Sequence, residues 1–114
     1  MNQRFPRTRR LRKRRDYLAV QGRGEKTHTR HFLVLRLAQD RERPTGRLGI
    51  TVTKRVGCAP VRNRIKRLVR EFVRQTDGWL PPGMDVVIIA KQSAANLGGL
   101  SDVERDLRPV GDRG

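Results

Sequence analysis

The segment 60–76 carries the strongest structural signal in this 114-residue chain. Its apolar residues recur at helical spacing and fall within an arc of about 140° when successive residues are placed about 100° apart. They are Val61, Ile65, Leu68, Val69, Phe72 and Val73. Pro60 suits the first position of a helix, and Asp77, Gly78 and the Pro81-Pro82-Gly83 turn end it. The pattern predicts an amphipathic helix with one side in a core.

Three apolar segments around this helix have the character of β-strands. Residues 31–37 (HFLVLRL) are mostly apolar, and residues 84–90 form the nearly continuous apolar run expected of a central strand. In residues 47–53, apolar Leu48, Ile50 and Val52 alternate with small or hydroxylated residues. A polar turn around Pro44 and Gly46 joins the first two strands. The alternation predicts that one face of the sheet is open and polar.

Two shorter helices complete the predicted order α-β-β-α-β-α. One begins at Asp16 and stops at Gly22 and Gly24, and the other covers residues 102–110, where Ser101 and Glu104 have capping-box spacing. Because a helix must cross between the second and third strands, the order favours a two-layer α/β sandwich with a partly parallel sheet. We expect a basic flexible arm at 1–9, one domain at 10–110 and a short tail at 111–114.

The charge of the chain points to a polyanionic partner. Its 27 Lys and Arg residues against 11 Asp and Glu residues give a formal net charge of +16, which disfavours a free, unneutralised surface. Basic residues concentrate in residues 4–15 and again from Arg62 to Arg74, where only Glu71 interrupts them. A merely solvated charged face is the alternative. RNA is favoured over DNA because no helix-turn-helix spacing is convincing, and aromatic residues are too few for a stacking platform.

Residues suited to protein-based catalysis or metal binding are scarce. Cys58 is the single cysteine, which excludes an internal disulfide and a structural zinc site. His28 and His31 would lie on opposite faces of an extended segment, and the carboxylates lack paired placement for metal ions. No apolar run approaches a membrane span and no secretory signal is evident. We therefore expect no catalytic residue, no metal-binding residue and a cytoplasmic protein.

Residues 57–71 (GCAPVRNRIKRLVRE) resemble the RNR signature of the bacterial ribonuclease P protein subunit. Residues 15–17 (RDY), 48–55 (LGITVTKR) and 85–91 (DVVIIAK) agree with the family in the same order. The resemblance implies a left-handed βαβ crossover. It also implies an accessory subunit of a ribonucleoprotein whose catalytic RNA, with magnesium, removes the 5′ leader from precursor tRNA. Magnesium would be bound mainly by the RNA, with no dedicated protein site.

The resemblance also implies two sets of site residues. The set expected to contact the catalytic RNA is Arg62, Asn63, Arg64, Lys66, Arg67 and Arg70. The set expected to line or flank a cleft for the tRNA leader is Tyr17, Thr51, Thr53, Lys54, Arg55 and Lys91. The expected partners are the catalytic RNA and precursor tRNA, without a membrane or an obligatory protein partner.

Two positions depart from the family pattern. Gln21 stands where relatives commonly have a second aromatic residue after Tyr17, and Pro60 stands where the family has valine.

Two other functions are alternatives to this interpretation. A structural, ribosome-associated RNA-binding protein would share the charge and the helix without needing a leader cleft. A stand-alone nuclease is the second alternative, which the scarcity of catalytic residues disfavours.

Overall fold

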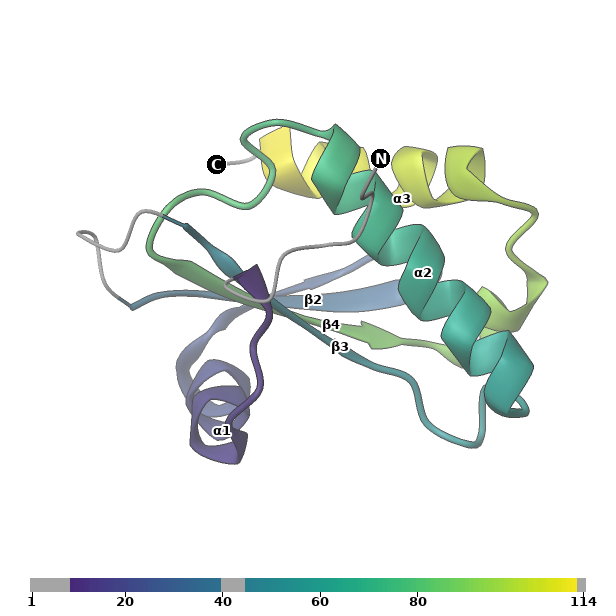
Figure 1. Cartoon of the computed structure of the whole chain (residues 1–114), viewed down its shortest axis with the longest axis horizontal. Coiled ribbons are helices and arrows are strands. Elements are labelled where there is room, and N and C mark those ends of the chain that lie inside the picture. The colour runs from purple at the N-terminus through teal and green to yellow at the C-terminus, as the bar shows by residue number, and fades with distance from the viewer. Residues whose placement is uncertain (1–8, 40–44, 113–114) are drawn as a thin grey trace.

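The computed structural model describes residues 9–39 and 45–112, which form three α-helices, a 3₁₀ helix and a four-stranded sheet (Figure 1). In chain order the elements are α1 (Arg14–Arg23), β1 (Glu25–His28), β2 (Phe32–Ala38), β3 (Arg47–Thr51), α2 (Ala59–Gln75), β4 (Met84–Ala90), η2 (Gln92–Asn96) and α3 (Leu100–Asp112). The predicted flexible arm at 1–9 lies outside the described residues apart from Arg9. The predicted tail differs in that α3 continues through residues 111 and 112.

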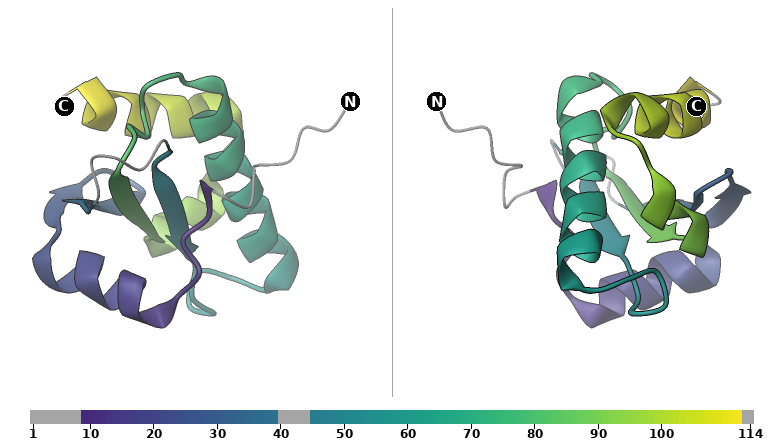
Figure 2. Two further views of the ribbon diagram at one scale, coloured as in Figure 1. Left: turned by 60° about the vertical axis from the view of Figure 1, so that its left-hand side comes forward. Right: turned by 90° about the vertical axis from the view of Figure 1, so that its right-hand side faces the viewer.

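The strands are ordered β1-β2-β4-β3, so β4 is central as predicted. β2 is antiparallel to both of its neighbours, whereas β3 and β4 are parallel, with Arg47 beside Asp85 and Thr51 beside Ile89. In Figure 1 the chain runs from left to right along β3, returns through α2 above the sheet, and enters β4 behind β3. Figure 2 agrees with that depth order. The β3-α2-β4 crossover is therefore left-handed, as the resemblance implied.

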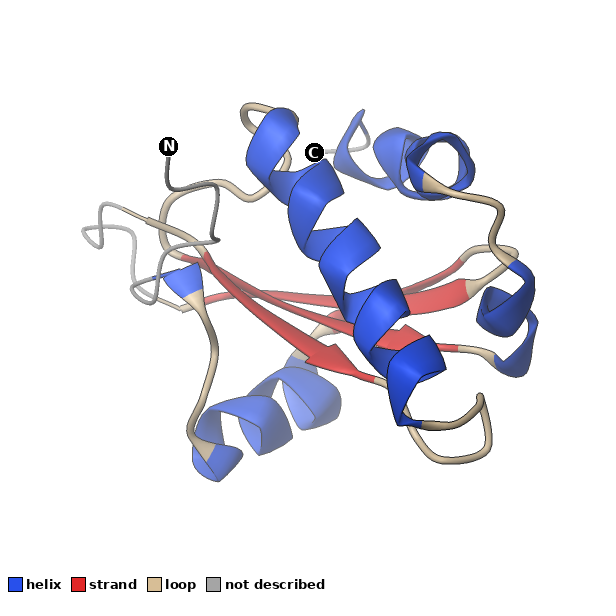
Figure 3. Ribbon diagram, turned by 45° about the vertical axis from the view of Figure 1, so that its right-hand side comes forward, coloured by secondary structure: helices blue, strands red, loops and turns tan. Residues whose placement is uncertain are grey.

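The main core lies between one face of the sheet and the helices α2 and α3 (Figure 3). α2 contributes the buried residues Ile65, Val69, Phe72 and Val73, all of which belong to the predicted apolar arc. The Phe72 and Trp79 rings meet edge to face with centroids 5.5 Å apart. The Trp79 indole N–H donates a hydrogen bond of 2.8 Å to the Leu107 carbonyl. This indole therefore ties the loop after α2 to α3.

The opposite face of the sheet carries α1 and a second, smaller core. Leu11, Val20, Leu35 and Val87 are its buried members. Tyr17, Leu33, Leu37 and Ile89 pack against them. The prediction of an open, polar face is thus wrong for β2 and β4, because β2 is apolar on both sides. On β3, Gly49 is also covered, by the Tyr17 ring, so only the half-buried Thr51 keeps the predicted character.

Other differences arise where the local sequence signal was weak or misleading. β1 was not predicted because its sequence, EKTH, is polar and mostly exposed. β3 ends at Thr51, so Thr53 lies in the following turn rather than in the strand. Ser101 lies inside α3 and therefore is not its capping residue; instead the Asp102 carboxylate accepts a hydrogen bond of 2.6 Å from the Gly98 N–H.

Candidate RNA-binding site

The polar side of α2 divides into three parts according to helical spacing. Arg62, Lys66 and Arg70 are four residues apart and form one row along the helix. Asn63 and Arg67 are exposed and point away from the sheet. Arg64 lies on the other flank. Six basic residues that are close in sequence therefore do not form one continuous surface.

We call the row of Arg62, Lys66 and Arg70 the basic row. Its Arg70 end lies at the β3 edge of the sheet, beside Tyr17 and Arg10. Arg70 lies close enough to Tyr17 and Arg10 to interact with both electrostatically. Arg10 precedes α1 and pairs with Leu48 at the β3 edge, where the Leu11 N–H donates to the Leu48 carbonyl at 2.8 Å. Sequence reasoning had not singled out Arg10, because only the fold brings it beside α2.

The electrostatics of the basic row favour an anion. Partial burial, and then the positive charge of Arg10, lower the pKa of Arg70. The Nε atoms of Arg10 and Arg62 are buried without a hydrogen-bond partner. In the described part of the chain, Arg74 is the one α2 cation in an ion pair, and its partner is Glu71. A phosphate bound beside Arg10 and Arg70 would offset the repulsion between the cations.

Tyr17 projects from α1 over the backbone of β3. A Cβ atom placed on Gly49 would lie 2.6 Å from the tyrosine ring and hydroxyl, so the ring contacts this strand only because residue 49 is glycine. Burial is the main cause that raises the pKa of the phenol, and the nearby Ile50 backbone partly offsets it. The ring is thus held at the sheet with part of its surface exposed.

The other residues predicted for the leader cleft occupy the end of β3 and the turn that follows. Thr51 is half-buried and lies on the same face of β3 as Gly49. Thr53, Lys54 and Arg55 are exposed in the turn between β3 and α2. These residues extend along the chain from the Tyr17 contact at Gly49 toward the start of α2.

Two of the predicted site residues are engaged elsewhere in the fold. The Arg64 guanidinium donates a hydrogen bond of 2.8 Å to the Leu97 carbonyl, which ties α2 to the loop before α3. The Lys91 ammonium donates to the Thr29 carbonyl at 2.7 Å, on the β2 side of β4 and away from β3. Both side chains therefore have a structural partner that their sequence context did not reveal.

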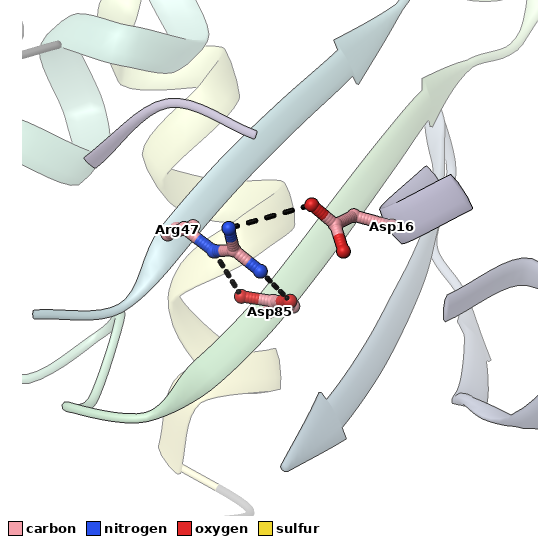
Figure 4. Close-up of polar contacts among 3 residues, drawn as sticks. All are labelled: Asp16, Arg47 and Asp85. Atoms are coloured by element: carbon pink, nitrogen blue, oxygen red, sulfur yellow. Dashed lines mark hydrogen bonds and ion pairs between the residues drawn. The ribbon is translucent and has the colours of Figure 1, made fainter. Parts of the chain in front are cut away.

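A chain of ionic contacts links α1 to the sheet beneath it (Figure 4). Asp85 on β4 is fully buried and accepts two hydrogen bonds from Arg47, at 3.0 and 2.7 Å. The remaining terminal nitrogen of Arg47 lies 3.4 Å from the Asp16 carboxylate. These contacts raise the pKa of Arg47, with the Asp85 hydrogen bond as the largest cause. An aspartate within the apolar run 84–90 was the sequence signal for this cluster.

The residues weighed for catalysis have structural surroundings. The His31 Nδ1 atom lies 2.9 Å from the Ser93 hydroxyl, and the Asp106 carboxylate accepts hydrogen bonds from the backbone N–H groups of Arg30 and His31. Cys58 is exposed immediately before α2. Within residues 9–39 and 45–112, no cluster of three His, Cys, Asp or Glu side chains could hold a metal ion. None of the helices described there is long and apolar enough to cross a membrane.

Comparison with known proteins gives a consistent assignment. The family model described as Ribonuclease P matches residues 5–110. The ribonuclease P protein component of Syntrophus aciditrophicus is 44% identical over 98 residues, covering 86% of this chain and 80% of that protein. That of Desulforapulum autotrophicum is 44% identical over 93 residues, with coverage of 82% and 78%. The solved ribonuclease P protein of Thermotoga maritima matches with a TM-score of 0.80 at 32% identity, covering 92% of this chain and 96% of that one. By both sequence and fold, this chain belongs to the ribonuclease P protein family.

Proposed function

We propose that this chain is the protein subunit of ribonuclease P, binding the catalytic RNA through α2 and the 5′ leader of precursor tRNA at the β3 edge. In this role it aids removal of the leader to give the mature tRNA 5′ end. One observation carries the proposal: the basic row of α2 and the half-exposed Tyr17 ring border the same strand edge. Cations beside an aromatic ring suit a phosphate backbone with an unpaired base.

The contact with the catalytic RNA is assigned to the basic row together with exposed Asn63 and Arg67. Guanidinium groups can hold two phosphate oxygens at once, which makes arginine effective at gripping a folded RNA backbone. The mutual repulsion of Arg10 and Arg70, which a bound phosphate would offset, supports this assignment. Arg64 would contribute indirectly by holding α2 to the Leu97 carbonyl.

The leader contact is assigned to Tyr17 and the surface that continues through Thr51, Thr53, Lys54 and Arg55. Gln21 lies one helical turn after Tyr17 and is exposed, so α1 offers one aromatic ring to the leader rather than two. One stacked base with flanking phosphate contacts would recognise an unpaired strand without reading its sequence. Lys91 would join this surface only after leaving the Thr29 carbonyl.

Hydrolysis is assigned to the RNA, with this chain as an accessory subunit. In this proposal magnesium is bound mainly by the RNA, as the resemblance implies. The precursor tRNA is the substrate of the assembled particle. The family match argues against the ribosome-associated alternative.

Reconstitution tests the proposal directly. Purified chain is combined with its cognate catalytic RNA, and cleavage of precursor tRNA is measured at low magnesium with the protein alone and the RNA alone as controls. We expect the protein alone to be inactive and the complex to cleave faster than the RNA. We also expect the complex to prefer precursor over mature tRNA more strongly than the RNA does. Cleavage by the protein alone, or no stimulation of the RNA, would refute the proposal.

A further inference from the structure

We propose that the ionic contacts Asp16–Arg47–Asp85 form a positioning device that sets the Tyr17 ring against β3. Asp16 immediately precedes Tyr17 on α1, whereas Arg47 and Asp85 belong to neighbouring strands. The functional part of this inference rests on the proposed role of Tyr17 in leader binding. Arg47 and Asp16 are thus positioning residues that act through Tyr17.

The sheet end of this device is rigid. Arg47 and Asp85 are register partners on the parallel strands β3 and β4, and two hydrogen bonds join their side chains. Because Asp85 has no solvent exposure, its charge requires the arginine, and the guanidinium plane is fixed by the paired contacts. The third nitrogen of Arg47 is therefore presented to α1 from a fixed place (Figure 4).

The helix end of the device is anchored elsewhere by Leu11, which is buried and donates a backbone hydrogen bond to Leu48 before α1 begins, and by Val20 further along the helix. Val20 is the one fully buried residue of α1, and the residue that precedes the helix, Lys13, makes no capping hydrogen bond with its side chain. Asp16 lies one helical turn before Val20, and Tyr17 lies between them. The side chains of Arg47 and Asp16 are 25% and 19% exposed, so water screens their attraction less than that of a surface pair. This contact can therefore fix the start of α1.

The fit of Tyr17 on β3 leaves little room for movement. The ring lies so close to Gly49 that even a Cβ atom there would collide with it. A small shift of α1 in one direction would press the ring into the strand. A shift in the other direction would lift it away from Gly49 and open the contact with the strand. The placement of Asp16 thus determines whether the ring keeps its contact with the strand at Gly49.

Asp16→Asn tests the device while sparing its buried part. Arg47 keeps Asp85 in this variant, so we expect the sheet to stay folded, with unchanged Trp79 fluorescence and thermal midpoint. Tyr17 is the single tyrosine in the chain, which makes its ring protons unambiguous by NMR. In the native chain we expect a nuclear Overhauser effect between these protons and the Gly49 α-protons. In Asp16→Asn we expect it to weaken strongly, and in Asp16→Glu to be largely retained.

Glu104→Gln is the matched control, since it also removes one negative charge and one ion-pair partner, on α3 and far along the chain. It should leave the Tyr17–Gly49 contact unchanged. In the reconstituted holoenzyme, we expect Asp16→Asn to reduce the preference for precursor over mature tRNA roughly five-fold through KM, a part of the stacking contribution of one base. Mature tRNA binding should be unaffected, and Asp16→Glu should restore the preference.

The outcomes separate this inference from the proposed function. An undiminished Tyr17–Gly49 contact in Asp16→Asn would overturn the positioning role, whatever the RNA measurements give. An equal loss of that contact in Glu104→Gln would overturn it as well. A lost contact with an unchanged tRNA preference would establish the positioning role and refute the proposed leader contact of Tyr17.

Discussion

α2 and α3 pack on the same face of the sheet and share one core, yet their outer surfaces have opposite character. α2 carries six basic residues and a single acidic one, Glu71. The α3 sequence has four acidic residues, Asp102, Glu104, Asp106 and Asp112, against two basic ones, Arg105 and Arg108. Asp102 and Asp106 accept hydrogen bonds from nearby backbone N–H groups, so they serve the fold.

The difference shows that packing and RNA binding make separate demands on a helix. Both helices bury an apolar stripe, which any amphipathic helix on a sheet must do. Only α2 adds cations that have few acidic partners, and it borders the strand edge where Arg10 and Tyr17 lie. Core substitutions in either helix should therefore lower stability by a similar amount. Substitutions on the outer surface should lower RNA affinity in α2 but not in α3.

Truncating a core residue in each helix should have the largest effect. The loss in the free energy of unfolding should be similar for the two helices. Ile65 of α2 and Leu107 of α3 are both fully packed in the main core. Ile65→Ala and Leu107→Ala should each lower the free energy of unfolding by about 3 kcal/mol, through lost burial and the cavity left behind. Urea denaturation followed by Trp79 fluorescence measures this. A several-fold difference between the two losses would contradict the shared core.

Removing basic residues from the outer surface should affect RNA binding differently in the two helices. Replacing Arg62, Lys66 and Arg70 by glutamine should weaken binding of the catalytic RNA by about 100-fold at fixed salt and flatten its salt dependence, since fewer counterions are released. The matched α3 variant, Arg105→Gln with Arg108→Gln, should change affinity by less than about two-fold because α3 is assigned no phosphate contact. Filter binding across a salt series measures both. Similar losses in the two variants would indicate a general charge effect rather than an interface on α2.

Removing the aromatic ring beside the basic row should have a smaller and more selective effect. Tyr17→Ala should weaken precursor tRNA binding to the holoenzyme by roughly ten-fold, because one base–aromatic stack is lost. Mature tRNA, which lacks the leader, should bind as before. Equal losses for the two RNAs would remove Tyr17 from the leader contact. Tyr17→Phe, which keeps the ring, is the control and should retain most of the preference.

The smallest effect should be on stability, when Glu71, the one acidic residue of α2, is replaced. The hydrogen bond from Arg74 is the main cause that lowers the pKa of Glu71. A lowered carboxyl pKa stabilises the folded chain at pH values above the unfolded pKa, and this contribution disappears as pH falls through the folded value. Because the pair is largely solvated, Glu71→Gln should cost no more than about 0.5 kcal/mol near neutral pH. Denaturation midpoints at pH 7 and pH 3 should show a smaller loss at pH 3 than at pH 7.

Most of the fold could be predicted because the long elements have strong patterns. The apolar arc of α2 and the run in β4 dominate their local sequence, and their tertiary contacts agree with both patterns. β1 could not be found this way, since an edge strand with exposed side chains needs no apolar alternation. The covering of the second sheet face was readable in principle, because Leu33, Leu35 and Leu37 place apolar side chains opposite Phe32 and Val34.

The candidate site was predictable in its residue types more than in its geometry. The motif pointed to α2 and Tyr17, but spacing alone did not separate Arg64 from the basic row. It also did not show that Lys91 is bound to the Thr29 carbonyl. Arg10, Arg47 and Asp85 come together only through strand pairing and the docking of α1. Contacts between residues that lie far apart in sequence leave no local pattern.

The short pairing of Arg10 and Leu11 with Leu48 has a consequence for solubility. An uncovered strand edge is a template for pairing with another molecule and so for aggregation. The N-terminal segment occupies part of that position on β3. At the other end of the sheet, β1 presents the charged Glu25 and Lys26, which oppose such pairing. Pairing of β3 with a strand of another molecule would first require residues 10 and 11 to dissociate from β3. Removing this segment would therefore expose an aggregation-prone strand edge.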